Sequence, residues 1–505
     1  MKKVKKLLSL IVAAVMVIAM AVPTFAAAPQ TFAITAPAGD HVYEIYQIFT
    51  GTYSEKSNVK TLSDLKWGAN SKRDANVNVG DAVAETVIND LKGATGTDSE
   101  KLAVIKKYAD LEHGAFSTVT DGANVNVAAG YYLIKDKNGS LVGKDDTYTL
   151  YIVQVVGDTV ITPKAKKPES FKKVKDTNDS TGTTTGWQDS ADYDIGDDVP
   201  FQLTGTVADD YDTYETYKFV FHDKESAGLT FKETSVNVFV DGKQITSGYT
   251  VTKNPADGDT FDVTFTDLKT INETDTEGNQ IKVHAGSTIT VEYTSTLNEN
   301  AKIGAEGNPN EMHLEYSNNP NDAQGGETGK TPDDKVIVFT YKTVINKVDE
   351  KGDPLKGAEF TLQKKVGDNW VNITRLTITD ETTFTFTGLD DGHYKLHESK
   401  TPEEYNSIAD IEFDIDATHD ENSSDPKLLT LTGNVTTGQA SFATEKDANQ
   451  KVTGSLTTNI VNKKGSSLPE TGGMGTKILY TLGVILVLGA GIVLVTRKRV
   501  SDAAK

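Results

Sequence analysis

The residues whose order most clearly suggests chemistry lie near the C-terminus. A pentapeptide, Leu468-Pro469-Glu470-Thr471-Gly472, precedes an apolar run from Ile478 to Val495, and the basic stretch Arg497-Lys498-Arg499 follows. About 18 apolar residues can cross a bilayer as a helix, and Lys and Arg beside such a helix stay on the cytoplasmic side. The pentapeptide is therefore expected outside the cell, where Pro469 keeps the chain extended and accessible to an enzyme.

The N-terminal end of the chain agrees with export. Several lysines after Met1, an apolar run from Leu7 to Val22 and small residues up to Ala28 predict a secretory signal peptide over residues 1–28, cleaved after Ala26 or Ala28. The chain has no cysteine, so an exported protein of this length must be stabilised by another kind of link or by its cores alone. The formal net charge of −21 disfavours nucleic acid as a partner and suits a solvated extracellular surface.

The hydrophobic pattern between these ends predicts three units rich in β-strands. About 440 residues are too many for one core, and short alternating apolar runs between Asp, Asn and Gly turn clusters favour β-sandwiches. We place the units at residues 29–165, 166–341 and 342–464, and the pentapeptide with its membrane helix at residues 465–505. Residues 83–91 and 99–111 have apolar side chains at helical spacing and predict helices inserted in the first unit.

Ordered motifs in the second and third units resemble the backbone pilins of sortase-assembled, Spa-type pili, which are built from Cna B-type domains. The matching stretches are Lys172-Lys173-Val174, Phe221-His222-Asp223, Gly228-Leu229-Thr230, Glu315 to Pro320, Lys347-Val348-Asp349, Leu355 to Phe360, Tyr394 to Ser399 with Pro402 and Tyr405, and Ile460-Val461-Asn462. The C-terminal pentapeptide, apolar run and basic tail resemble the LPXTG cell-wall sorting signal of Gram-positive surface proteins. The resemblance implies an all-β chain of tandem immunoglobulin-like sandwiches, with helical insertions in the first and a C-terminal transmembrane helix.

The resemblance further implies bonds inside the units, between a lysine on the first strand and an asparagine on the last, assisted by a carboxylic acid. The implied residues are Lys347, Asn462 and Glu398 in the third unit, and Lys172, Asn318 and Asp223 in the second, with Lys173 and Asn319 as alternatives. Physical chemistry supports such a reaction, because burial removes the proton of a lysine and makes it a nucleophile. A buried acid stays protonated and can polarise the asparagine carbonyl. The first unit has Lys135 where an acid would be expected, so no internal bond is expected there.

The resemblance implies a second kind of bond, between subunits, which involves the C-terminal pentapeptide and the linker between the first and second units. In the family, the peptide bond after Thr471 is cut and Thr471 is joined to a lysine of the next subunit. That lysine ends a Tyr-Pro-Lys motif, and here Lys164 follows Pro163 with Thr162 in place of tyrosine. The implied partners are pilus-specific and housekeeping sortases, identical subunits arranged head to tail, minor pilins, peptidoglycan and host surface ligands. The implied location is the cell wall and pilus, with a precursor held transiently in the membrane.

Two other classes of function compete with a shaft subunit. A minor or tip pilin, or a singly anchored adhesin, would carry the same C-terminal signal. An exported enzyme such as a glycosidase would need a marked pair of acids, and none of the many Asp and Glu residues is marked by its setting. The sequence has no zinc-protease, serine-hydrolase or phosphate-loop motif, and no acidic loop has the ligand spacing of an EF-hand. We therefore expect no enzyme activity, no cofactor and no metal site marked by a motif, and the acidic loops leave calcium binding open.

Overall fold

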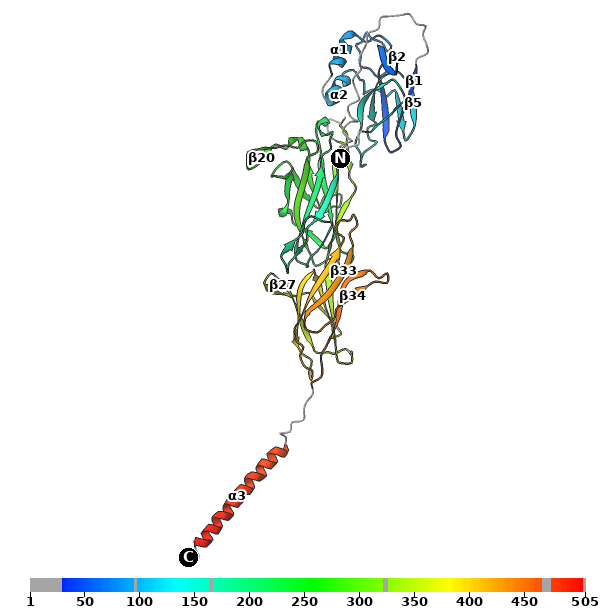
Figure 1. The fold of residues 1–505 in the computed structure, drawn as a ribbon. Helices are drawn as coiled ribbons and strands as arrows, with labels where there is room; N and C mark the ends of the chain where they lie inside the picture. The colour runs from blue at the N-terminus through cyan, green and yellow to red at the C-terminus, as the bar shows by residue number, and fades with distance from the viewer. Residues whose placement is uncertain (1–29, 95–97, 164–166, 321–325, 466–473, 503–505) are drawn as a thin grey trace.

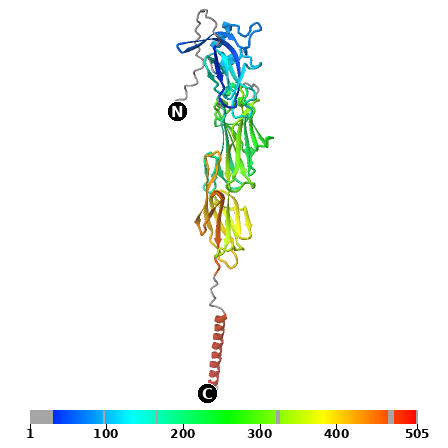
Figure 2. The same ribbon diagram turned by 90° about the vertical axis from the view of Figure 1, so that its right-hand side faces the viewer.

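The computed structural model describes residues 30–94, 98–163, 167–320, 326–465 and 474–502 of the 505-residue chain. β-Strands dominate it, and they form three units that follow one another in chain order along an elongated molecule (Figures 1 and 2). Each unit has its own cluster of buried apolar side chains. The expected all-β fold class is therefore confirmed.

The first unit combines two sheets with two helices. One sheet has the order β3-β2-β6-β7, with β4 also paired to β2, and the other has the order β5-β1-β8. The strands are β1 (Thr31–Thr35), β2 (Val42–Lys56), β3 (Val59–Trp67), β4 (Ser117–Thr120), β5 (Asn124–Ala128), β6 (Gly130–Asp136), β7 (Leu150–Val155) and β8 (Thr159–Val160). The two expected helices are present as α1 (Glu85–Gly93) and α2 (Asp98–Lys106), although α2 ends earlier than residue 111 because a turn follows Lys106.

The second unit is a sandwich of two larger sheets. One sheet has the order β12-β25-β23-β14-β19-β18, with β24 paired to β23, and the facing sheet has the order β17-β16-β22-β13-β9, with β15 paired to β22. The strands of the first sheet are β12 (Ser190–Asp192), β14 (Phe219–Glu225), β18 (Thr250–Lys253), β19 (Phe261–Phe265), β23 (Asn308–Ser317), β24 (Thr328–Lys330) and β25 (Asp334–Phe339). Those of the second are β9 (Ser170–Val174), β13 (Asp198–Thr206), β15 (Leu229–Phe231), β16 (Asn237–Val240), β17 (Lys243–Ile245) and β22 (Thr288–Leu297).

Short elements decorate the loops of the second unit. Two small hairpins pair β10 with β11 and β20 with β21, and three single-turn 3-10 helices lie between longer strands. Their bounds are β10 (Thr177–Asn178), β11 (Thr183–Thr184), β20 (Glu273–Thr274), β21 (Gln280–Ile281), η1 (Tyr211–Thr213), η2 (Glu233–Ser235) and η3 (Leu268–Thr270).

The third unit is a smaller sandwich of two five-stranded sheets, β29-β30-β26-β35-β34 and β28-β27-β31-β32-β33. Its strands are β26 (Tyr341–Val348), β27 (Glu359–Val366), β28 (Asn369–Ile373), β29 (Leu376–Thr379), β30 (Thr383–Leu389), β31 (Gly392–Lys400), β32 (Ile411–His419), β33 (Leu428–Thr437), β34 (Ala443–Lys446) and β35 (Val452–Val461). The helix α3 (Met474–Asp502) lies beyond it, and an 18-residue window within Lys477–Arg499 has a mean hydropathy of 2.7 and is not buried. This helix is long and apolar enough to be the expected membrane span.

Alternating burial explains why these segments pair as strands. In β22 every second residue faces the core, namely Ile289, Val291, Tyr293, Ser295 and Leu297, while the residues between them are partly exposed. Successive side chains of a strand point to opposite faces, so a lysine or asparagine at a core-facing position is carried into the interior. The candidate residues below are positioned in this way.

Candidate functional site

The first and last strands of the third unit bring two of its predicted residues together. β26 and β35 lie side by side and parallel, with Lys347 opposite Ile460. Asn462 directly follows β35, and its backbone N–H donates to the carbonyl of Val348 (3.2 Å). Glu398 comes from β31 in the facing sheet. The strand pairing therefore places a lysine and an asparagine more than a hundred residues apart in sequence at the same end of the unit.

The three side chains form a buried cluster. Lys347 and Asn462 are 0% exposed and Glu398 is 7% exposed. Lys347 Nζ donates to the carbonyl of Ile460 (2.8 Å), and Asn462 Nδ2 donates to Glu398 Oε2 (3.1 Å). Within the described residues, the other carboxylate oxygen of Glu398, Oε1, and the amide oxygen of Asn462, Oδ1, have no hydrogen-bond partner. Burial lowers the pKa of Lys347 to about 8, against a smaller opposing effect of Glu398, so the uncharged amine is readily available.

The second unit has a comparable cluster between its two sheets. Lys172, on β9, donates through Nζ to Asp223 Oδ2 on β14 and to the hydroxyl of Tyr293 on β22 (2.8 Å). The Tyr293 hydroxyl donates to the same Asp223 oxygen (2.8 Å). Asn310, on β23, donates through Nδ2 to the Tyr293 hydroxyl (2.9 Å). Lys172, Asp223 and Asn310 are all 0% exposed, so the cluster consists of a lysine, an acid and an asparagine within the core.

The electrostatics of this cluster favour uncharged groups. Burial lowers the pKa of Lys172 and raises the pKa of Asp223. Burial, with Asp223 nearby, also raises the pKa of Glu225 to about 8. Asp223 Oδ1 and Asn310 Oδ1 are buried and lack hydrogen-bond partners among the described residues. A neutral amine beside a protonated acid and an amide carbonyl is the set of groups that amide exchange requires.

The structure corrects the choice of asparagine in the second unit. Asn318 is fully buried but lies elsewhere, because its Nδ2 donates to the carbonyls of Leu141 (3.0 Å) and Asp146 (3.2 Å) in the first unit. The alternatives are also engaged elsewhere: Lys173 Nζ donates to Asp189 Oδ1, and Asn319 Nδ2 donates to Glu327 Oε2 (2.7 Å). Asn310, which the sequence interpretation did not select, takes the place expected of Asn318.

A signal for Asn310 is present in the sequence pattern. Along β23, the core-facing positions are Asn308, Asn310, Met312, Leu314 and Tyr316. An asparagine in phase with apolar core residues must find polar partners inside the protein. The motif from Glu315 to Pro320 led the prediction to an asparagine at the end of β23. The alternation of core-facing residues indicates Asn310, near the beginning of the same strand.

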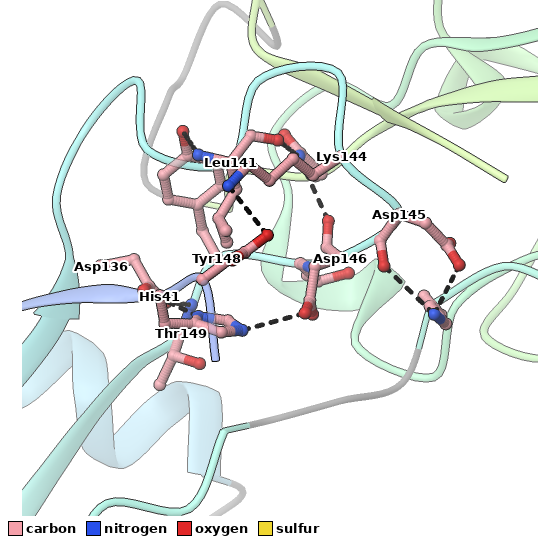
Figure 3. A network of polar contacts seen from close by, with 12 residues as sticks. His41, Asp136, Leu141, Lys144, Asp145, Asp146, Tyr148 and Thr149 are labelled. Carbon is pink, nitrogen blue, oxygen red and sulfur yellow. Dashed lines mark hydrogen bonds and ion pairs between the residues drawn. The ribbon is translucent and has the colours of Figure 1, made fainter. Parts of the chain in front are cut away.

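Asn318 belongs to the junction between the first and second units, which Figure 3 shows from close by. In that junction His41 lies between two acids, with Nδ1 2.9 Å from Asp136 Oδ1 and Nε2 3.0 Å from Asp146 Oδ2. The two carboxylates outweigh the effect of burial and raise the pKa of His41 to about 9. The Tyr148 backbone N–H donates to the Asn318 carbonyl (2.7 Å). The segment after β6 is thus fixed to both units.

Several predicted residues lie outside the described residues. These are the signal peptide, Lys164 and the pentapeptide Leu468 to Gly472. Lys135 occupies the position in the first unit where an acid would be expected. Its Nζ donates to Asn138 Oδ1 (2.7 Å) and lies 3.6 Å from Glu44 Oε2.

Comparison with known protein families gives two matches. Residues 342–427 match the family described as SpaA, a prealbumin-like fold domain, and residues 460–502 match the LPXTG cell wall anchor motif. The first match covers the strands that carry Lys347 and Glu398. The second begins at Ile460 and includes Asn462, the pentapeptide and α3.

Similar proteins are found along most of the chain. The trypsin-resistant surface T6 protein of Streptococcus pyogenes serotype M6 is 26% identical over 447 residues, which are 75% of this chain and 77% of that protein. The solved T6 backbone pilin of the same serotype has a TM-score of 0.49 at 18% identity, covering 86% of this chain and 98% of that one. The full-length major pilin SpaD of Corynebacterium diphtheriae has a TM-score of 0.45 at 16% identity, covering 87% and 98%.

The sorting signal read from the sequence is confirmed by the anchor match, and the sandwich domain is confirmed by the prealbumin-like match. The chain is accordingly anchored in the cell wall at the cell surface, with a precursor that is transiently membrane-bound. The matches show a SpaA-type prealbumin-like domain at residues 342–427 and an LPXTG cell wall anchor at residues 460–502, in a chain that is similar to a streptococcal surface protein over most of its length.

Proposed function

We propose that this chain is the shaft subunit of a covalent pilus, in which a pilus-specific sortase joins Thr471 of one subunit to Lys164 of the next. The observation that carries the proposal is the buried third-unit cluster of Lys347, Glu398 and Asn462. A shaft subunit must transmit tension from one subunit to the next, and this cluster lies where the chain enters and leaves the unit. A housekeeping sortase would then attach the finished fibre to peptidoglycan.

The proposed reaction in the third unit balances without any co-reactant. The uncharged Lys347 amine attacks the side-chain carbonyl carbon of Asn462, and the bond from that carbon to Nδ2 breaks. One C–N bond forms, one C–N bond breaks, and ammonia leaves with the proton that the lysine amine loses. Glu398 can relay the proton from the lysine amine to the leaving nitrogen. The contact between Asn462 Nδ2 and Glu398 Oε2 supports this role.

The second unit would undergo the same reaction with Lys172 as nucleophile, Asp223 as acid and Asn310 as the amide. The three side chains meet through Tyr293, whose hydroxyl contacts all of them. The resulting bond would link β9 of one sheet to β23 of the other. Because the chain has no cysteine, two such bonds would replace disulfides as covalent stabilisers.

The link between subunits is tested in cell-wall extracts boiled in detergent. A wild-type strain should give a ladder of high-mass species, and a Lys164→Ala strain should lose it. Lys167→Ala is a matched control, because Lys167 is a linker lysine whose Nζ already donates to Asp145 Oδ2 (2.6 Å). A single wild-type band would instead favour a singly anchored adhesin, and a ladder that survives Lys164→Ala would exclude Lys164 as the acceptor.

A further inference from the structure

The junction between the second and third units holds a histidine and two aspartates that the proposed function does not use. Asp176 follows β9 and Asp192 ends β12, both in the second unit, and His419 ends β32 in the third. One potential ligand atom from each residue lies within 4.8 Å of the others. Residues more than 200 positions apart in sequence therefore converge across the boundary between two units.

One carboxylate oxygen of this group is buried without a partner. Asp192 is only 2% exposed, and its Oδ2 has no hydrogen-bond partner in the described part of the chain. The side chains of Asp176 and His419 are 14% and 7% exposed. No lysine or arginine among the described residues forms an ion pair with Asp176 or Asp192. A buried carboxylate without a partner is costly unless a cation or a proton accompanies it.

Hydrogen bonding fixes which nitrogen of His419 faces the acids. The single proton of the Ser190 hydroxyl is donated to the carbonyl of Asp420 (2.6 Å), because a carbonyl can only accept. The same Ser190 oxygen lies 2.7 Å from His419 Nδ1, so Nδ1 carries a hydrogen and donates it to Ser190. In the neutral imidazole, Nε2 then presents a lone pair. The Nε2 atom lies 3.3 Å from Asp176 Oδ2, and a cation between the two atoms would be held by both.

We propose that Asp176, Asp192 and His419 bind one divalent transition-metal ion of the zinc class, with water as the fourth ligand. Zinc binds nitrogen and carboxylate oxygen at about 2.0–2.2 Å, so two ligands of a tetrahedral site lie roughly 3.3 Å apart. The separation of His419 Nε2 and Asp176 Oδ2 fits this value. A hydrogen bond from the remaining imidazole nitrogen, here to Ser190, is typical of metal-bound histidine. Calcium prefers six to eight oxygen ligands and does not suit this set.

The ion would connect the last residue of β32 in the third unit to β12 and the start of the second unit. Backbone and side-chain contacts already join the same segments: the Asp189 N–H donates to the Glu421 carbonyl (2.8 Å), and the Ser423 N–H donates to Asp189 Oδ2 (2.8 Å). A metal ion would add a link with fixed geometry to this junction. Zinc should therefore raise the unfolding temperature of the two units and restrict their relative motion.

The test uses the full chain, purified in detergent without a histidine tag and dialysed against buffered free Zn²⁺. Bound zinc is counted by elemental analysis, and Co²⁺ replaces zinc to give an absorption band of tetrahedral geometry. Wild type should hold one more equivalent of zinc than His419→Ala or Asp176→Asn, and both variants should lose the cobalt band and the zinc-dependent rise in unfolding temperature. His393→Ala is the matched control, because His393 lies on the neighbouring strand β31 and pairs with Asp414 (2.6 Å).

Several results would overturn the site. The site would be overturned if wild type bound no zinc, or if wild type and His419→Ala bound equal amounts. It would also be overturned if His393→Ala lost the same equivalent of zinc as His419→Ala. Displacement of zinc by an equal concentration of Ca²⁺ would overturn the assignment of metal class. If His419→Ala fails to fold, as judged by circular dichroism, Asp176→Asn carries the test, because Asp176 is the most exposed of the three side chains.

Discussion

Lys347 and Lys364 are both buried in the third unit, yet their surroundings have opposite effects. Lys364 contacts the carboxylates of Asp194 (2.7 Å) and Asp390, and these charges raise its pKa despite the opposing effect of burial. Lys347 has a single acid near it, so burial lowers its pKa to about 8. Burial alone does not make a lysine a nucleophile; the balance between burial, which lowers the pKa, and neighbouring carboxylates, which raise it, decides. Lys364 is accordingly suited to an ion pair and Lys347 to a reaction.

The choice between Asn310 and Asn318 gives a sharp prediction for the second unit. With internal bonds in both units, intact-mass spectrometry should find wild type about 34 Da below its sequence mass, because each bond releases one ammonia of about 17 Da. After correction for the substitution itself, Asn310→Ala should show only one loss of about 17 Da. It should also lower the free energy of unfolding by about 4 kcal/mol or more, on the entropy estimate for a closed loop of this length.

Asn318→Ala is the control for that prediction. Asn318 is as buried as Asn310, but its contacts are with the carbonyls of Leu141 and Asp146. Its substitution should leave both mass losses in place while weakening the junction with the first unit. If Asn318→Ala had lost one ammonia and Asn310→Ala had lost two, Asn318 and not Asn310 would be the asparagine bonded to Lys172.

At the scale of strands and loops, periodicity predicted the elements better than it predicted the partners of their side chains. The all-β class and the inserted helices follow from patterns within a dozen residues. Lys347 and Asn462 were predicted from motifs at both ends of the third unit, and the pairing of β26 with β35 places them at the same end of that unit. Asn310 was not predicted, because its contact with Tyr293 beside Lys172 depends on how the two sheets that carry β9 and β23 pack together. His419 with Asp192 is a similar case, since no local spacing relates residues from different units.

His41, which directly precedes β2 and contacts Asp136 and Asp146, gives a prediction about pH. The pKa of His41 is raised to about 9 from an ordinary value of 6.5, by Asp136 and Asp146, while Tyr43 stacks on its ring (5.2 Å). A raised pKa means that the protonated imidazole stabilises the folded state. This contribution is fully present below about pH 6.5 and is lost as the pH rises through about 9.

The unfolding temperature of wild type should therefore exceed that of His41→Gln most at pH 6, and the difference should shrink by pH 9.5. His113→Gln serves as the comparison, because His113 also pairs with an acid, Asp110 (2.7 Å), but its side chain is 82% exposed. That variant should differ little from wild type at either pH. A difference for His41→Gln that stays constant from pH 6 to 9.5 would show that the charge of His41 does not stabilise the junction.

For the whole molecule, the positions of the proposed bonds define the path of force through a fibre. Tension would enter a subunit at Lys164 and leave at Thr471, so the first unit, which precedes Lys164, would carry none. A bond from Lys347 to Asn462 would let force bypass the roughly 114 residues between them. Stretched fully, such a segment adds about 380–410 Å at roughly 3.3–3.6 Å per residue. The third unit would therefore be inextensible only if its internal bond is present.

This can be measured on single molecules, because a chain without cysteine can be given unique handles by Lys164→Cys and Thr471→Cys. Pulled between these positions, the otherwise wild-type chain should show no step of about 400 Å, whereas Glu398→Ala should show one, since the acid that assists the reaction is missing. Glu359→Ala is the matched control, because Glu359 lies on β27 with its side chain 60% exposed and pairs only with Lys400 in the described part of the chain (3.1 Å). It should behave as wild type. A step of about 400 Å in the wild-type chain would mean that Lys347 and Asn462 are not joined and that the third unit resists force by its hydrogen bonds alone.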